Sequence, residues 1–210
     1  MTKLTQEEIL EERIRIMDDP VYFALKYLPQ WFRIAPKDGS CAIPWFHRAN
    51  LAIMARDCEF LEKYGDIDKI VEHFPKIFSL NEDGKLMMGY TQNTLLEIPR
   101  GFAKTTVTRA FILWSMVTRL RRVVLLISHA SDHSKAECKE IRKTIEGSAE
   151  IKQIFGELVP ERSDEVSRKW TGEELQLRND ATLITRSAGS QIRGLVRDGH
   201  RPDLIIIDDL

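Results

Sequence analysis

Apolar and polar residues follow two different patterns on either side of residue 94. Upstream, apolar residues recur at the three- and four-residue spacing of amphipathic helices, and segments rich in Pro and Gly separate these helices. Helices are expected over residues 5–17, 20–28, 45–63 and 68–73. The first begins at a capping-box signature, in which Thr5 is followed three residues later by Glu8. Residues 1–90 are therefore predicted to form a helical N-terminal extension with a lid-like region.

Downstream of residue 94, short apolar runs alternate with helical segments. Strands are expected at 95–98, 123–127 and 204–207, helices at 104–119 and 131–145, and a hairpin with arms at 175–178 and 182–185. The runs at 123–127 and 204–207 are apolar throughout, which is typical of strands buried on both faces of a parallel sheet. This alternation predicts an α/β domain over residues 91–210, in which helices flank a mainly parallel sheet.

The composition excludes several classes of protein. The chain has 210 residues, 43% of them hydrophobic, and its 31 basic and 32 acidic residues leave a net charge of −1. A uniformly basic nucleic-acid coat is excluded, so any contact with nucleic acid would come from a local patch. The polar N-terminus does not match a secretory signal, and no apolar run approaches the roughly 18 residues of a membrane span. The three widely spaced cysteines fit a reducing cytoplasm rather than a disulfide scaffold.

The first candidate motif is a loop between a predicted strand and a predicted helix. It reads Pro99-Arg100-Gly101-Phe102-Ala103-Lys104-Thr105-Thr106. The N–H groups and dipole of a helix N-terminus attract anions, so Lys104 would reach the β- and γ-phosphates of a nucleotide, and Thr105 would place its hydroxyl on Mg²⁺. Ile98 and Ala103 stand where the phosphate-loop consensus has glycines. An ordinary loop-to-helix junction is the alternative for this motif alone.

The second candidate motif is an acidic pair at the end of an apolar strand. Residues 204–207 are followed by Asp208 and Asp209. Such a strand ends at the edge of the sheet where ligands bind, so Asp208 would hold Mg²⁺ and Asp209 would orient or deprotonate the attacking water. The alternative is a buried strand that ends in a solvated acidic turn.

The third candidate motif is the stretch over residues 186–202, which is rich in arginine and glycine. Guanidinium groups are planar and permanently charged, and they suit the charge of a phosphoryl transition state. Arg193 or Arg197 could act as a finger on the nucleotide of a neighbouring subunit, or contact a DNA phosphate. The alternative for each arginine is a solvated basic loop.

Together these stretches resemble the ATPase domain of the large terminase subunit of tailed bacteriophages and related proviruses. The resemblance rests on residues 98–106, 189–194 and 201–209, on their order, and on residues 44–48, which are similar to an upstream segment near the adenine in that family. It implies a P-loop NTPase fold of the RecA-like kind, with a sheet that continues beyond the last residue of the chain.

The resemblance also implies roles for individual residues. Arg100, Lys104 and Thr105 would serve the phosphates and the metal, and Asp208 would serve the metal. The remaining residues assigned to the nucleotide are Pro99, Gly101, Phe102, Ala103, Thr106 and His47. Trp45 and Phe46, with His47, could stack on the adenine, or they could anchor the start of a helix in the core.

The activity implied by the resemblance is Mg²⁺-dependent ATP hydrolysis that drives double-stranded viral DNA into a procapsid. The implied partners are a portal protein, a small terminase subunit and further copies of the large subunit in a ring, all in the host cytoplasm. The nuclease domain of that family would lie beyond Leu210. The expectation for this chain alone is therefore weak or absent ATPase activity and no DNA cleavage.

Two other functions stay open at the level of sequence. Another P-loop ATPase that acts on nucleic acid, such as a helicase, would carry the same two nucleotide motifs but would need a second RecA-like half. A nucleotide-binding or interaction module without turnover would also fit, because Ala103 replaces a loop glycine. Binding and turnover measured separately distinguish these possibilities.

Overall fold

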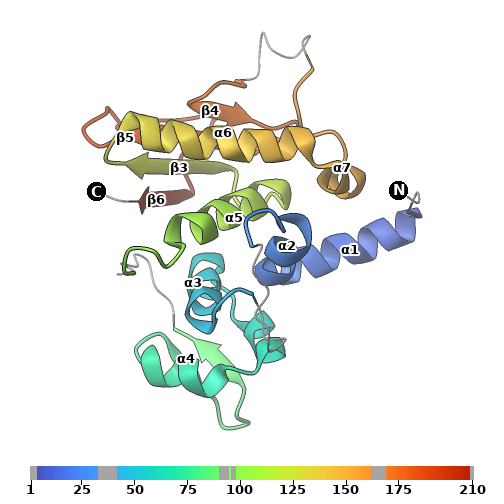
Figure 1. The fold of residues 1–210 in the computed structure, drawn as a ribbon, viewed down its shortest axis with the longest axis vertical. Coiled ribbons are helices and arrows are strands. Elements are labelled where there is room, and N and C mark those ends of the chain that lie inside the picture. The colour runs from blue at the N-terminus through green and yellow to red at the C-terminus, as the bar shows by residue number, and fades with distance from the viewer. Residues whose placement is uncertain (1–3, 33–41, 90–94, 96–97, 162–168, 209–210) are drawn as a thin grey trace. The chain divides into compact units, whose positions relative to one another are not determined.

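The computed structural model describes residues 4–32, 42–89, 95, 98–161 and 169–208 (Figure 1). The chain divides into two compact units, which we describe separately. One unit comprises Met1–Ile14 and Ile112–Leu210, and the other comprises Arg15–Phe111. The divisions fall within helices α1 (Gln6–Asp18) and α5 (Lys104–Val117), whereas the sequence predicted a single boundary between residues 90 and 91.

The larger unit is built on a four-stranded sheet in the order β4-β5-β3-β6. The strands are β3 (Val123–Ser128), β4 (Glu174–Gln176), β5 (Thr182–Ser187) and β6 (Leu204–Asp208). β5 and β6 both pair in parallel with β3, whereas β4 pairs antiparallel with β5. The expected α/β class and the expected hairpin of β4 and β5 are thus confirmed, and the sheet is mixed.

Among the described strands of this sheet, the central strand β3 and the outer strand β6 differ in burial. Every residue of β3 is buried, as its apolar run predicts. In β6 the exposure alternates instead, and Ile205 and Ile207 are 55% and 56% exposed. The prediction that this run is buried on both faces was therefore wrong. In the described sheet β6 pairs with β3 only, so it has one neighbouring strand and one covered face.

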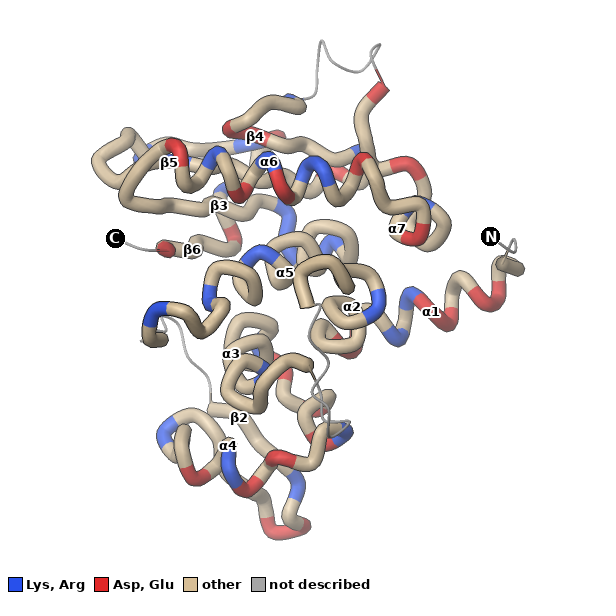
Figure 2. Tube along the Cα trace, viewed as in Figure 1, with Lys and Arg blue, Asp and Glu red and all other residues tan. Residues whose placement is uncertain are grey.

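Helices flank this sheet. Helix α6 (Ser131–Gly147) runs along β3, β4 and β5 (Figure 1) and buries Cys138 and Ile141, while acidic and basic residues alternate along its outer side (Figure 2). The last turn of α5 is tied to the β4–β5 turn, because the Asn179 amide donates to the Met116 carbonyl at 2.9 Å. Helix α7 (Ala149–Phe155) follows α6 and is capped by the hydroxyl of Ser148.

The second unit is mainly helical in its described part. It contains α2 (Pro20–Tyr27), α3 (Trp45–Ala55), the 3₁₀ helix η1 (Glu59–Tyr64), α4 (Ile67–His73) and a hairpin of β1 (Phe78–Leu80) and β2 (Leu86–Met88). A turn over residues 81–84 joins the two strands, which were not predicted from sequence. The single helix expected over 45–63 is divided, because Arg56 adopts a left-handed conformation with φ of 60°.

Polar side chains fix the helices of the second unit. The buried carboxylate of Asp19 caps α2 by accepting from the N–H groups of Val21 and Tyr22, and the Tyr64 hydroxyl donates to the same carboxylate at 3.0 Å. Arg48 is also buried and forms an ion pair with Asp66. No helix among the described residues is long and apolar enough to cross a membrane.

Candidate phosphate-binding loop and acidic strand end

The 99–103 loop has the backbone geometry that a glycine-rich loop would provide. Gly101 and Ala103 both have positive φ, at 84° and 55°. Helix α5 begins directly afterwards at Lys104, and its first backbone hydrogen bond runs from the Val107 N–H to the Ala103 carbonyl. Left-handed backbone costs an L-residue about 1–2 kcal/mol, which explains why glycine suits the position that Ala103 occupies. The loop therefore leads directly into a helix whose first residues, Lys104 and Thr105, are half-buried.

A buried histidine holds this loop. The ring Nε2 of His47, on α3, is hydrogen-bonded to the Phe102 carbonyl, and His47 is only 2% exposed. Burial lowers the pKa of His47, so the ring is neutral at neutral pH, Nε2 carries the proton and donates it. The other ring nitrogen, Nδ1, is buried and has no hydrogen-bond partner among the residues that the structure describes. The sequence assigned His47 to the nucleotide, and the contact it makes in the structure is with the loop backbone.

A cavity of about 330 Å³ lies beside the loop in the same unit. Its lining includes Trp45 and Phe46 from the first turn of α3, Phe74 after α4, and Ile98 and Phe102 around the loop. The rings of Phe46 and Phe102 pack edge to face, with their centroids 5.9 Å apart. Of the strand predicted at residues 95–98, only the two end residues are described. Trp45 and Phe46 thus line a hollow rather than filling the core completely.

Asp208, the candidate metal ligand, lies at the carboxyl ends of the parallel strands. In the strand register Ser128 is opposite both Ser187 and Asp208, so β3, β5 and β6 end side by side. Ligands of open α/β sheets bind at this edge. Asp209 lies outside the described residues. The 99–103 loop belongs to one compact unit and Asp208 to the other, so their approach to a common nucleotide stays a prediction.

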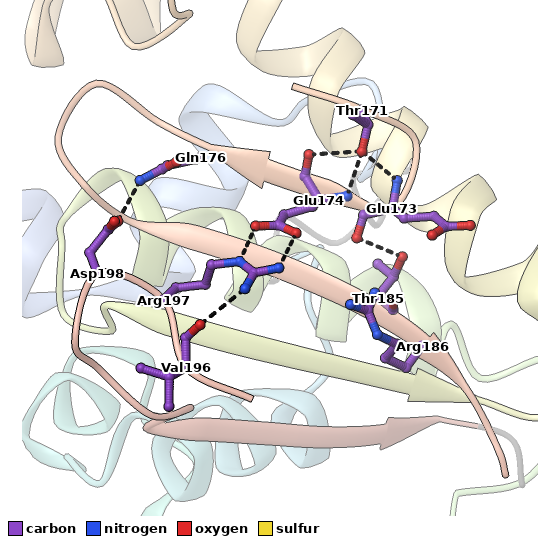
Figure 3. A network of polar contacts seen from close by, with 9 residues as sticks. All are labelled: Thr171, Glu173, Glu174, Gln176, Thr185, Arg186, Val196, Arg197 and Asp198. Atoms are coloured by element: carbon purple, nitrogen blue, oxygen red, sulfur yellow. Dashed lines mark hydrogen bonds and ion pairs between the residues drawn. The ribbon is translucent and has the colours of Figure 1, made fainter. Parts of the chain in front are cut away.

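The 188–203 segment is held against the sheet by apolar and charged contacts. Ile192 and Leu195 pack on Val123, Leu125, Ile127 and Ile184. Arg197 forms a two-pronged ion pair with Glu174 of β4, in which Nη2 donates to Oε2 at 2.7 Å, and Nη1 donates to the Val196 carbonyl (Figure 3). Hydrogen bonds to the Glu174 carboxylate raise the pKa of Arg197. The guanidinium of Arg197 is therefore occupied within its own chain.

Arg193, the other candidate for an arginine finger, has a different environment. Arg193 is exposed, and its side chain makes no ion pair or hydrogen bond within the part of the chain that the structure describes. It lies six residues beyond Ser187, the last residue of β5. Of the two arginines that the sequence offered, Arg193 is therefore the one without a partner among the described residues.

Three further polar residues shape this segment and were not found from sequence. Glu174 holds Arg197, the Gln176 amide donates to Asp198 at 2.5 Å, and the Asp203 carboxylate accepts from the N–H groups of Arg122 and Val123 (Figure 3 for the first two). Of these three residues, only Asp203 could have been identified from the sequence, because it directly precedes the apolar run of β6. The partners of Glu174 and Gln176 lie more than twenty residues away, so no local pattern reveals them.

Comparison with known proteins identifies no relative of this chain. No family model matches the chain, and neither a curated protein nor a solved structure matches it. The functional argument therefore rests on two features of the chain itself. These are the loop that leads into α5 at Lys104 and the parallel strand that ends at Asp208.

Proposed function

We propose that this chain is the ATPase portion of a viral DNA-packaging motor with a P-loop NTPase fold, which binds Mg²⁺-ATP through the 99–103 loop and Asp208. The observation that carries the proposal is the backbone of this loop. It places two left-handed residues, Gly101 and Ala103, directly before a helix that begins with Lys104 and Thr105. The order of left-handed turn, helix start and lysine is what a phosphate-binding loop requires.

The proposed chemistry assigns one task to each group. The helix start and Lys104 neutralise the β- and γ-phosphates, and the Thr105 hydroxyl and Asp208 hold Mg²⁺. Asp209 orients the attacking water. The pairing of Arg197 with Glu174 favours Arg193 as the arginine that contacts a neighbour's nucleotide or a DNA phosphate.

In this proposal the chain works within a larger assembly. Copies form a ring at a portal protein in the host cytoplasm, a small terminase subunit selects the viral genome, and double-stranded DNA is the load. These partners follow from the resemblance of the three motifs to the terminase family, together with the α/β sheet. A nucleotide-binding module without turnover is the second candidate, and it is favoured by the Cβ that Ala103 carries into the left-handed position of the loop.

Binding of ATP with Mg²⁺, followed by isothermal titration calorimetry, tests the proposal. Lys104→Ala should weaken binding roughly tenfold to a hundredfold, because a charge-assisted contact to phosphate contributes about 1.5–3 kcal/mol. Lys143→Ala is the matched control, since Lys143 is exposed on α6. Equal affinities for the wild type and Lys104→Ala would contradict the proposal.

Release of phosphate, measured on the same samples, separates the two candidate functions. A motor ATPase should release phosphate in a Lys104-dependent way, with Mg²⁺ required. Binding that depends on Lys104 without phosphate release would favour the module without turnover.

A further inference from the structure

A second cavity, of about 150 Å³, lies at the amino ends of two parallel strands. Val123 and Thr182 line it, and they are the first residues of β3 and β5 and partners in the strand register. Asp208 ends β6 at the opposite, carboxyl edge of the same sheet. The cavity is therefore separated from Asp208 by the length of the parallel strands.

The size of this cavity limits what it can hold. A volume of about 150 Å³ has room for a few water molecules, each of which occupies roughly 30 Å³ in the liquid. It is well below the roughly 300–1,000 Å³ of sites for small organic ligands. A whole nucleotide is therefore too large, and the occupant must be a compact group.

A tight hairpin turn forms one wall of the cavity, through Arg197, Asp198 and His200. Arg197 and His200 exchange both backbone hydrogen bonds at 2.8 Å, and Asp198 and Gly199 between them have positive φ, at 48° and 79°. Asp-Gly pairs favour this kind of two-residue turn. The pair of Arg197 with Glu174 ties the turn to β4 (Figure 3), so this wall is fixed in place.

Thr182 contributes a buried hydroxyl to the lining. Its side chain is on the same face of β5 as Ile184, two residues on, and the 188–203 segment packs on this face. Thr182 is only 1% exposed, and its Oγ1 makes no hydrogen bond with any described residue. Thr185 of the same strand donates to the Glu173 carbonyl at 3.1 Å. Buried hydroxyls without a partner are rare, so this group marks a place for a ligand or an ordered water.

The three arginines of the lining are held to different degrees. Arg197 is already paired, and Arg119 approaches Asp180 only at 3.6 Å, with both of these side chains about half exposed. Arg122 forms no ion pair with any described residue, and its Nη1 donates to the His200 Nε2 at 2.8 Å. A guanidinium without a carboxylate partner, close to a buried hydroxyl, is a set of donors that suits a compact anion.

We propose that this cavity binds a compact oxyanion of the phosphate class, with free inorganic phosphate as the ligand. The guanidinium groups of Arg122 and Arg119 donate to its oxygens, and the Thr182 hydroxyl supplies a further donor. Arg197 keeps its pair with Glu174 and holds the hairpin turn in place. The lining contains none of the residues assigned to Mg²⁺-ATP, so the inference does not depend on the proposed function.

Calorimetric titration with inorganic phosphate, in a chloride buffer of constant ionic strength, tests the inference on the wild-type chain. Phosphate should bind at a saturable site. Lys104→Ala should keep this binding, because Lys104 does not line the cavity. Absence of saturable binding would overturn the inference, and so would its complete loss in Lys104→Ala, which would place the phosphate at the 99–103 loop.

Substitutions in the lining locate the bound phosphate. Arg122→Gln and Thr182→Val should each weaken phosphate binding roughly tenfold, because each removes a donor to a charged ligand. Arg201→Gln is the matched control, since Arg201 is exposed on the same segment but outside the lining, and it should bind phosphate like the wild type. Equal affinities for all three variants would overturn the inference.

The test does not depend on the arginine variant being folded. Thr182→Val keeps a β-branched side chain and removes a hydroxyl that no described residue uses, so it should fold like the wild type, as circular dichroism in phosphate-free buffer would verify. If Arg122→Gln does not fold, Thr182→Val decides the test alone. Unchanged phosphate affinity in folded Thr182→Val would overturn the inference.

A duplex oligonucleotide distinguishes free phosphate from the phosphate groups of nucleic acid. Both ligands are titrated separately into the wild type and into Arg122→Gln. Binding of inorganic phosphate that Arg122→Gln weakens would support the inference. Oligonucleotide binding that Arg122→Gln weakens, without any binding of inorganic phosphate, would assign the site to nucleic acid and overturn the inference.

Discussion

The 99–103 loop and the 188–203 segment are both irregular, yet they are held in different ways. The loop is fixed through its backbone, by the hydrogen bond from His47 to the Phe102 carbonyl. The 188–203 segment is fixed through its side chains, by the pair of Arg197 with Glu174 and by the packing of Ile192 and Leu195. A segment that is held through its backbone can still use its side chains to bind a ligand. In a segment that is held through its side chains, those side chains are already engaged in contacts within the protein.

This difference changes which charged residues are candidates for a functional role. Both regions attracted attention from sequence because they combine glycine with basic residues. In the structure, Arg197 stabilises its own segment, and Arg193 in the same segment is exposed. Within this segment, the pairing of Arg197 with Glu174 therefore makes Arg193 the stronger candidate for a contact with an external phosphate.

Replacement of Glu174 should give the largest effect on the side-chain-fixed segment. Glu174→Ala leaves the partly buried Arg197 without its carboxylate and should lower the free energy of unfolding by about 3 kcal/mol, measured by urea denaturation. The adjacent Glu173→Ala is the matched control, because Glu173 pairs with Lys135 on the surface. That control should leave the urea midpoint unchanged, and equal shifts for both variants would contradict the distinction.

Acidification should weaken the backbone-fixed loop. Burial lowers the pKa of His47 below its unfolded value, so the unfolded chain takes up a proton first as the pH falls below about 6.5. The stability that His47 contributes is therefore present above that pH and lost below it, by at most about 1.4 kcal/mol per pH unit. Urea denaturation from pH 7.5 to 5.5 measures the slope. His47→Gln should reduce it, and an unchanged slope would exclude His47 as its source.

The smallest expected effect comes from the strained residue of the loop. Ala103→Gly removes a Cβ from a left-handed position and should raise the free energy of unfolding by about 0.5–1 kcal/mol, as seen in a higher melting temperature. Ala136→Gly, at an exposed position within α6, should lower it by about 1 kcal/mol. Changes of the same sign in both variants would show that Ala103 is not strained.

Strong local signals predicted most elements of the fold correctly. The capping box is present, since the Thr5 N–H donates to Glu8 and the Glu8 N–H donates to the Thr5 hydroxyl. Helices α5 and α6 and strand β3 lie close to where the apolar spacing placed them. Each of these elements has a long periodic or continuous apolar pattern, so its identity depends little on distant residues.

Short elements without such patterns were missed. Strands β1 and β2 have three residues each, and η1 is separated from α3 by the left-handed Arg56. Helix α7 follows α6 after one residue, Ser148, whose capping role was not recognised. Three residues cannot display a period, and a left-handed arginine has no residue signature, so tertiary contacts select these conformations.

The candidate site was predicted in part. The loop, the helix start at Lys104 and the strand that ends at Asp208 were all located from residue patterns. Asn50 was not selected, because a single asparagine on a predicted helix gives no indication that its amide lines a cavity. The partner of Arg197 was not predicted either, because Glu174 is 23 residues away.

The sequence by itself determined the local elements and the order of the three motifs, because caps and apolar periods act over a few neighbouring residues. Only the tertiary structure decided that β6 is the outer strand of the described sheet, that Arg197 is paired and that Asn50 lines an aromatic cavity. These properties depend on which distant segments meet, and that is set by the packing of the whole unit rather than by any local pattern.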